Sequence, residues 1–231
     1  MGSKQTPHFS TKTFTYLKSL AANNNKQWFE AHRNDYEEHV REPALAYIAA
    51  MAPMLKKISP HFTALARRSG GSLMRVHRDM RFAKDGNRYK TNIGIQFRHE
   101  RGRDVHAPGF YVHVEPGACF LGAGIWRPES SALAAIRMEI SDRPADWKRA
   151  SGPRRFTEKF AFHGDQLTRP PKGYSSDSPH LEDLRRKDFI ALTNVTDAFA
   201  RRTDLPAASG ALFRRTAPLM RFLCAALDLE F

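Results

Sequence analysis

Residues 92–126 read NIGIQFRHERGRDVHAPGFYVHVEPGACFLGAGIW, and apolar and polar side chains alternate along much of this segment. Ile93, Ile95 and Phe97 alternate with polar residues or glycine, and the same period of two recurs twice before the segment ends. A period of two is typical of a β-strand with one buried and one open face. The segment therefore predicts consecutive strands.

The pattern begins earlier, because Met74 and Val76 alternate with Arg75 and His77. The connections between the predicted strands are short, which favours antiparallel pairing, since parallel pairing needs a long crossover. We expect a central antiparallel sheet of about four strands within residues 73–126. Its buried face should carry Met74, Val76, Ile93, Ile95, Phe97, Val112 and Val114.

Helical patterns flank the predicted sheet. Apolar residues recur at helical spacing over residues 11–58, where Asn24 and Gln27 resemble a capping box, and residues 129–231 read as mostly helical. Residues 1–10 are expected to be disordered. The fold class is therefore α+β, in one domain spanning residues 1–231, with the helices at both ends of the chain covering the apolar face of the sheet.

Cysteine usage and hydropathy indicate a cytoplasmic protein. Cys119 and Cys224 both lie in apolar stretches, so we expect two buried thiols and no disulfide between them. No stretch approaches the roughly 20 apolar residues that a membrane helix needs, so no membrane partner is expected. The oligomeric state does not follow from the sequence.

Positive charge is concentrated in the middle of the chain. The formal net charge is +13, and residues 67–103 hold eleven Lys and Arg against three Asp and Glu. An excess of this kind is typical of proteins with an anionic partner. The alternative is a basic surface that serves only solubility.

The most distinctive segment is RVHRDMRFAKDGNRYK, residues 75–90, in which cations alternate with aromatic residues. Arginine forks suit phosphate oxygens and aromatic rings can stack on a base, so we expect a site for a phosphorylated small molecule or a nucleic acid. An ion-pair network that braces a hairpin would use the same residue types. The candidate ligand-binding residues here and on the polar sheet face are Arg75, Arg78, Arg81, Phe82, Lys84, Tyr89, Lys90, Gln96, Tyr111 and Trp126.

Three glycines fall on the polar face of the predicted sheet: Gly94, Gly122 and Gly124. Glycine inside a strand often marks a close approach to the backbone, here either by a ligand or by another part of the protein.

Segment 75–90 also resembles the signature of a bacterial family, the domain of unknown function 2461. The matching residues are Arg75-x-x-Arg78-Asp79-x-Arg81-Phe82, then Lys84-Asp85 and Tyr89-Lys90, and further matches extend over nearly the whole chain. Gly86 and Arg88 stand where the family often has lysine and proline. The resemblance implies a bacterial protein of this length, and it implies no activity, cofactor or catalytic residue.

Catalysis is an alternative to binding alone. His77, Asp79, His113 and Glu115 lie on the predicted polar face and could act as acid and base, or bind one metal ion. The surrounding arginines would repel a cation, so no metal ligand is predicted. The leading hypothesis is a phosphate-bearing ligand; an acid–base enzyme and a non-catalytic interaction domain remain the alternatives.

Overall fold

The computed structural model describes residues 8–79, 87–102 and 107–231. Residues 1–7, where disorder is predicted, lie outside these ranges. The predicted disorder is wrong for Phe9, which is fully buried and packs against the ring of Tyr47 at 5.6 Å between centroids.

The described residues form one antiparallel sheet of six strands in the order β1-β2-β3-β4-β6-β5. The strands are β1 (Phe62–Thr63), β2 (Ile93–His99), β3 (Gly109–Val114), β4 (Phe120–Ile125), β5 (Ala161–His163) and β6 (Phe189–Asn194). The α+β class and the antiparallel pairing are confirmed. The sheet has six strands where about four were expected: β5 and β6 come from the region predicted to be mostly helical, and β1 comes from residues 62–63, before the predicted sheet.

Residues 73–79 do not form the first strand of this sheet, contrary to the sequence prediction. They run beside β2 with isolated bridges, Leu73 to Ile95 and His77 to Tyr89. Leu73 and Val76 pack with the core, whereas Met74 is only half-buried and lies over Gly94 on the opposite face. The predicted burial of Met74 beneath the helices is therefore wrong, because the backbone does not keep strand alternation here.

The N-terminal helices are α1 (Thr11–Ala22), α2 (Lys26–Ala31), α3 (Arg33–Tyr36), the π-helix η1 (Glu37–Arg41) and α4 (Glu42–Lys56). The cap of α2 is Asn25, whose side chain accepts from the Trp28 N–H, so the capping role predicted for Asn24 is wrong. Pro43 is the second residue of α4, which continues directly from η1.

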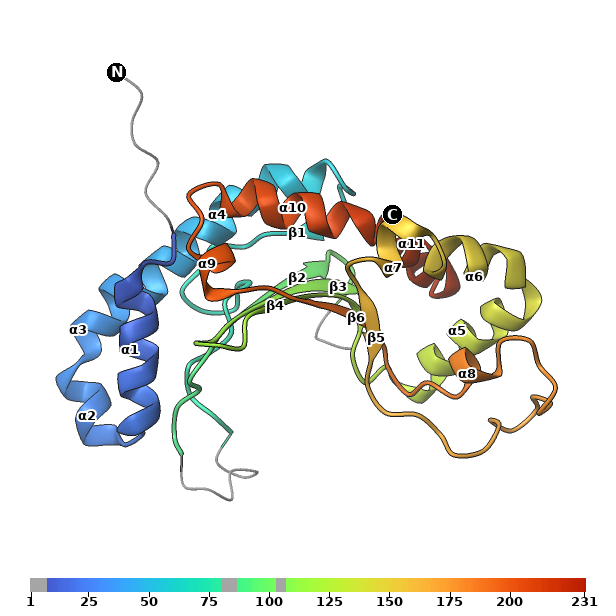
Figure 1. The fold of residues 1–231 in the computed structure, drawn as a ribbon, viewed down its shortest axis with the longest axis horizontal. Helices are drawn as coiled ribbons and strands as arrows, with labels where there is room; N and C mark the ends of the chain where they lie inside the picture. Colours follow the sequence, from blue (N-terminus) through green and yellow to red (C-terminus); the bar gives the residue numbers. More distant parts are fainter. Residues whose placement is uncertain (1–7, 80–86, 103–106) are drawn as a thin grey trace.

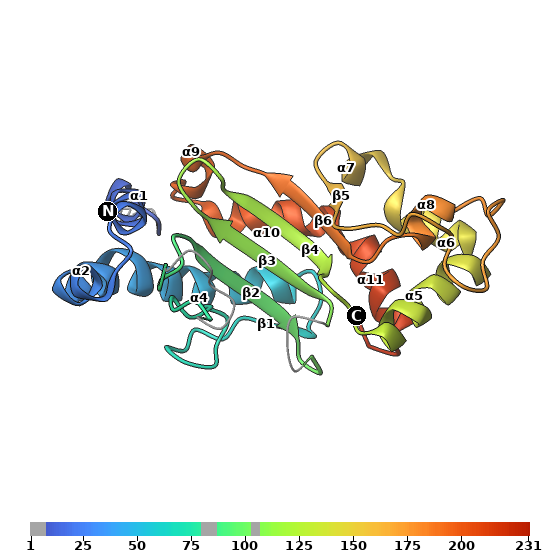
Figure 2. The same ribbon diagram turned by 90° about the horizontal axis from the view of Figure 1, so that it is seen from below.

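The C-terminal half supplies α5 (Ser130–Asp142), α6 (Pro144–Ser151), α7 (Arg154–Thr157), α8 (Leu181–Leu184), α9 (Asp197–Ala200), α10 (Leu205–Arg215) and α11 (Ala217–Ala226). Helices α4 and α10 cover one face of the curved sheet, as Figures 1 and 2 show. The side chains of Ile95, Phe97 and Val112 are buried on this face, as predicted. The opposite, concave face lies between the α1–α3 end and the α5–α8 end (Figure 1).

Both cysteines are buried and free, which confirms that no disulfide joins them. Within the described ranges, every helix is too short or too polar to cross a membrane.

Candidate functional site

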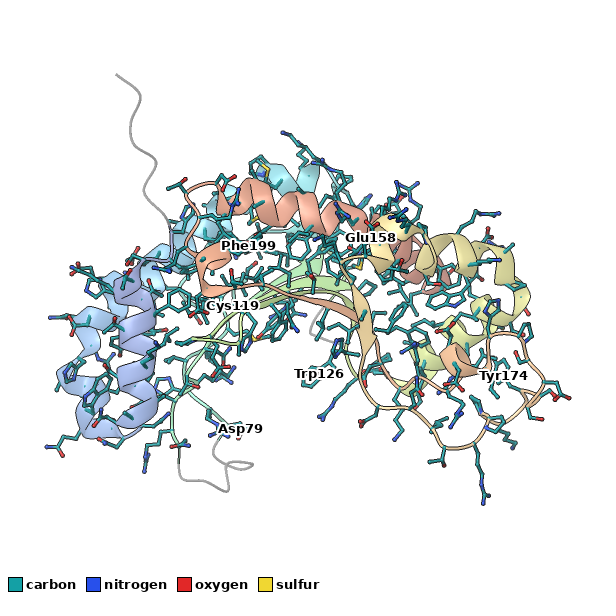
Figure 3. All side chains as sticks on the ribbon, in the orientation of Figure 1. Asp79, Cys119, Trp126, Glu158, Tyr174 and Phe199 are labelled. Atoms are coloured by element: carbon teal, nitrogen blue, oxygen red, sulfur yellow. The ribbon has the colours of Figure 1, made fainter. Side chains whose placement is uncertain are left out.

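A pocket of about 390 Å³ lies on the concave face of the sheet. Trp126 projects from the end of β4 into this space, away from α4 and α10 (Figure 3). Its side chain is 47% exposed, which is unusual for a residue of its size. The walls are Met74, Gln96, Gly109, Phe110, Tyr111, His113, Phe120, Gly124, Trp126, His163, Gly164, Ile190 and Leu192. The pocket is therefore mostly apolar and aromatic, with a few polar groups.

Strand register brings these side chains together. Tyr111 on β3 pairs with Gln96 on β2 and with Gly122 on β4, and His113 pairs with Phe120. Cross-strand partners project to the same face, so one band across β2, β3 and β4 forms the floor. The polar face predicted from alternation exists, and it is more apolar than the sequence suggested because β6 adds Ile190 and Leu192.

The three glycines make room for neighbouring protein atoms. A Cβ on Gly94 would lie 2.8 Å from the Tyr111 hydroxyl, and one on Gly122 would lie 2.8 Å from Leu192. Gly124 has a φ of +132°, and its Cβ would lie 2.0 Å from the Phe189 carbonyl oxygen. The close approach predicted at these glycines is thus made by the protein itself.

Gln96 carries an unsatisfied polar group at the pocket wall. The residue is only 7% exposed, and its Oε1 has no hydrogen-bond partner within the described residues. Gln96 also lines a second, smaller cavity of about 190 Å³ beside Ser72 and Arg98. A buried acceptor without a partner costs about 1–3 kcal/mol, so a donor arriving with a ligand would be stabilised here.

His113 has three polar partners, the side chains of Glu115, Tyr111 and Asn92. Its Nε2 lies 3.0 Å from Glu115 Oε2, and its Nδ1 lies 3.2 Å from the Tyr111 hydroxyl. The imidazole stacks on Phe120 with a centroid separation of 4.5 Å. Burial, followed by the charge of Glu115, raises the pKa of Tyr111 to about 12. Tyr111 is therefore a neutral phenol at physiological pH.

Two positive charges, Arg75 and Lys90, lie near each other in the segment that contains the pocket residue Met74. Arg75 follows the pocket residue Met74, and burial together with the charge of Arg75 lowers the pKa of Lys90. Across the described ranges, no ion pair involves either residue. An anion beside them would offset the like-charge repulsion and favour the charged form of Lys90.

A carboxylate fixes the far rim of the pocket. Asp188 is buried and accepts from the backbone N–H groups of Arg127 and Asp165, at 2.6 and 3.2 Å. These bonds tie the turn after β4 to the turn after β5. The guanidinium of Arg127 stacks over the Trp126 ring at 4.7 Å from its centroid, which adds a positive charge at the rim.

Tyr89 and His77 lie outside the pocket walls. Tyr89 is buried and stacks on Phe29 at 4.1 Å between centroids, and His77 lies 5.1 Å from the Tyr89 ring. Both side chains therefore connect segment 75–90 to α2, and neither is placed to stack on a ligand in the pocket.

The remaining candidate residues of segment 75–90 divide into two groups. Arg78 and Asp79 are described, and each has an interaction partner; Figure 3 places Asp79 on the segment that descends from the sheet. Arg81, Phe82 and Lys84 lie outside the described residues. Within the described part of the chain, no three His, Cys, Asp or Glu side chains gather to bind a metal ion.

The sequence did not predict the pocket residues of the C-terminal half, because residues 129–231 were expected to be mostly helical. These residues are His163, Gly164, Ile190 and Leu192. Residues 189–194, FIALTN, do alternate in burial. Both faces of this strand carry apolar side chains, since one faces the core and the other faces the pocket, so a contrast in polarity was absent.

The comparisons with known proteins identify one relationship. The family of conserved hypothetical proteins DUF2461 matches residues 12–222. The chain belongs to this family. No curated protein and no solved structure matches it. The expected resemblance is thereby confirmed over nearly the whole chain, and the family description assigns no activity.

Proposed function

We propose that this DUF2461 protein binds a small phosphorylated ligand with a planar ring, of the nucleotide class, on the concave face of its sheet. The observation that carries the proposal is the aromatic pocket beside Trp126, with the wall residue Gln96, whose Oε1 has no hydrogen-bond partner among the described residues. Ligand pockets of about 300–1,000 Å³ with apolar walls and a few polar groups are the usual form of small-molecule sites.

The ring is expected to lie against Trp126 and the band formed by Tyr111 and Phe120. Stacking of this kind contributes about 1–3 kcal/mol per base in other proteins. Gln96 would then bind a ring donor, because rotation of its amide presents either a donor or an acceptor. A heterocycle with a polar edge fits this wall better than a plain hydrocarbon ring.

The phosphate is expected near Arg75 and Lys90. Neither cation has an ion-pair partner among the described residues, and the pKa of Lys90 is lowered by burial and then by the charge of Arg75. Phosphate oxygens accept charge-assisted hydrogen bonds from both side-chain types. The local charge excess noted in the sequence supports the same placement.

A thermal-shift and calorimetric screen tests the proposal, using nucleoside monophosphates, the matching nucleosides, sugar phosphates, inorganic phosphate and a short oligonucleotide. We expect the monophosphates to bind more tightly than the nucleosides. Arg75→Ala and Lys90→Ala should each weaken monophosphate binding by about 1.5–3 kcal/mol, the scale of a hydrogen bond to a charged group. They should leave nucleoside binding nearly unchanged.

The matched controls are Arg214→Ala and Lys18→Ala, which remove exposed charges from helices α10 and α1. If these controls weaken binding as much as the pocket variants, the interaction is non-specific. Tight oligonucleotide binding with a steep loss at higher salt would replace the small ligand with a nucleic acid. If no compound in the screen shifts the melting temperature, the alternative of a non-catalytic interaction domain is favoured.

A further inference from the structure

A hydrogen-bonded chain leads from Glu115 through His113 to the pocket wall. Glu115 Oε2 lies 3.0 Å from His113 Nε2, and His113 Nδ1 lies 3.2 Å from the Tyr111 hydroxyl. Tyr111 and His113 both line the pocket, whereas Glu115 does not. The chain therefore ends on Tyr111, a residue of the pocket wall.

The partners of His113 determine where its ring proton lies. An ionised carboxylate only accepts hydrogen bonds, so Nε2 carries a proton and donates to Glu115. In the neutral ring Nδ1 is then an acceptor, with the Tyr111 hydroxyl and the Asn92 amide, at 3.3 Å, as its donors. The other oxygen of Glu115 accepts from the Thr91 hydroxyl at 3.0 Å, which fixes the carboxylate.

The protonation state of His113 consequently sets the direction of the Tyr111 hydroxyl. Beside a neutral His113, the hydroxyl donates to Nδ1 and presents lone pairs to the pocket. Beside a protonated His113, Nδ1–H donates to the Tyr111 oxygen, and the hydroxyl proton turns toward the pocket. The first state suits a ligand donor, and the second suits an anionic ligand oxygen.

We infer that Glu115, His113 and Tyr111 form a proton relay that makes this pocket an acid–base site for a ligand with an anionic oxygen at the Tyr111 wall. Tyr111 gives its proton to the ligand oxygen, and the resulting phenolate takes the Nδ1 proton of His113. The net change is one proton moved from His113 to the ligand, with Tyr111 restored. Glu115 is a positioning residue, because it acts through His113.

The surroundings of His113 favour this arrangement. Tyr111 faces it from β3, Glu115 from the position just after β3, Asn92 from the segment before β2, and the uncharged ring of Phe120 from β4. Among the described residues, Glu115 is therefore the charged group that contacts His113 directly. Because burial raises the pKa of Tyr111 to about 12, Tyr111 is a neutral phenol at neutral pH, and its hydroxyl can pass a proton between His113 and a ligand only by receiving one as it gives one.

The inference rests on the proposed pocket, so its test uses a probe that reports binding and protonation separately. The probe is 4-nitrophenolate, a planar ring with an anionic oxygen, and its neutral isostere is 4-nitroanisole. Calorimetry at mildly alkaline pH, in two buffers of different ionisation enthalpy, measures binding and proton uptake together. We expect uptake of about one proton with the phenolate and none with the isostere.

Variants locate the proton. His113→Gln should abolish proton uptake, and Tyr111→Phe should weaken phenolate binding about tenfold or more while changing isostere binding less than about twofold. Glu115→Gln should reduce proton uptake, since it replaces the carboxylate oxygen that accepts from His113 Nε2 and positions the ring. The control Tyr174→Phe, in the loop before α8, should match the wild type in every measurement.

The outcomes are distinguishable. Binding of both probes without proton uptake would overturn the relay and leave the pocket proposal intact. Failure of the wild type to bind either probe would count against the pocket and, with it, the relay. A nitrogen NMR spectrum that places the ring proton of neutral His113 on Nδ1 would also overturn the relay, without any ligand.

Discussion

Asn24 pairs with the backbone of Tyr89 through both ends of its side-chain amide. Its Nδ2 donates to the Tyr89 carbonyl oxygen at 2.9 Å, and its Oδ1 accepts from the Tyr89 N–H at 2.9 Å. The Asn24 side chain thus pairs with the Tyr89 backbone as a neighbouring strand would. It anchors segment 75–90 to the N-terminal helices. Phe29 completes the anchor by stacking on the Tyr89 ring.

Asn24→Ala should destabilise the protein by about 2 kcal/mol, because two hydrogen bonds to a buried backbone are lost at about 1 kcal/mol each. Urea denaturation measures the change. Asn23→Ala is the matched control, since Asn23 makes one exposed bond to the Ser19 carbonyl and should cost less than about 0.5 kcal/mol. Equal losses for the two variants would show that the Asn24 pairing adds no stability.

Gly124→Ala should be among the most destabilising single changes in the sheet, by about 3 kcal/mol or more. The added Cβ would meet the Phe189 carbonyl oxygen at 2.0 Å, at a φ of +132°. Gly173→Ala separates the two causes, because Gly173 also has a positive φ, of +91°, but has open space around it. We expect about 1 kcal/mol for that variant, from backbone strain alone. Similar losses in thermal denaturation would refute the steric explanation.

Tyr111 should contribute to alkaline unfolding. Its pKa is raised from 10.0 to about 12 in the folded protein, so the unfolded chain loses the phenolic proton first as pH rises. The associated stability is present below pH 10 and is lost progressively toward pH 12. Tyr111→Phe should make the free energy of unfolding less steep between these pH values, by up to about 1.4 kcal/mol per pH unit. An unchanged slope in denaturant titrations would contradict the burial of this phenol.

Both thiols should react slowly while the protein is folded. Burial raises the pKa of Cys119 to about 11 and of Cys224 to about 12, so neither forms the reactive thiolate near neutral pH. A chromogenic disulfide reagent should label both within minutes in denaturant and neither on that timescale without it. Rapid labelling of Cys224 in the native protein would mean that α11 opens readily.

The sheet could be predicted where one strand face was apolar and the other was not. Ile93, Ile95 and Phe97 alternate cleanly with polar residues or glycine, and they are buried beneath the helices as expected. Strand β6 escaped prediction because Ile190 and Leu192 are apolar on its pocket face as well. Residues 73–79 were predicted as a strand because Met74 and Val76 alternate with Arg75 and His77, but their pairing consists of isolated bridges.

The candidate site was predictable in part. Gln96, Tyr111, His113 and Trp126 share the pocket because strand alternation and register are regular there. The long-range anchor of Tyr89 was not visible, because the bond to Asn24 spans 65 positions and no local pattern encodes it. The role of Glu115 depended on side-chain rotamers, which the sequence does not specify.

The central claim, that the concave pocket binds a phosphorylated ring, is tested most directly by the NMR signals of the three tryptophan indole N–H groups during titration with adenosine 5′-monophosphate. Trp126→Phe assigns the pocket signal, and Trp147 is a buried internal reference whose Nε1 donates to Asp183 at 2.7 Å. The account predicts that the Trp126 signal shifts along a saturating curve, that Trp28 and Trp147 stay in place, and that Lys90→Ala weakens the response about tenfold or more. A Trp126 signal that does not move at millimolar ligand, or that moves no more than the other two, would contradict it.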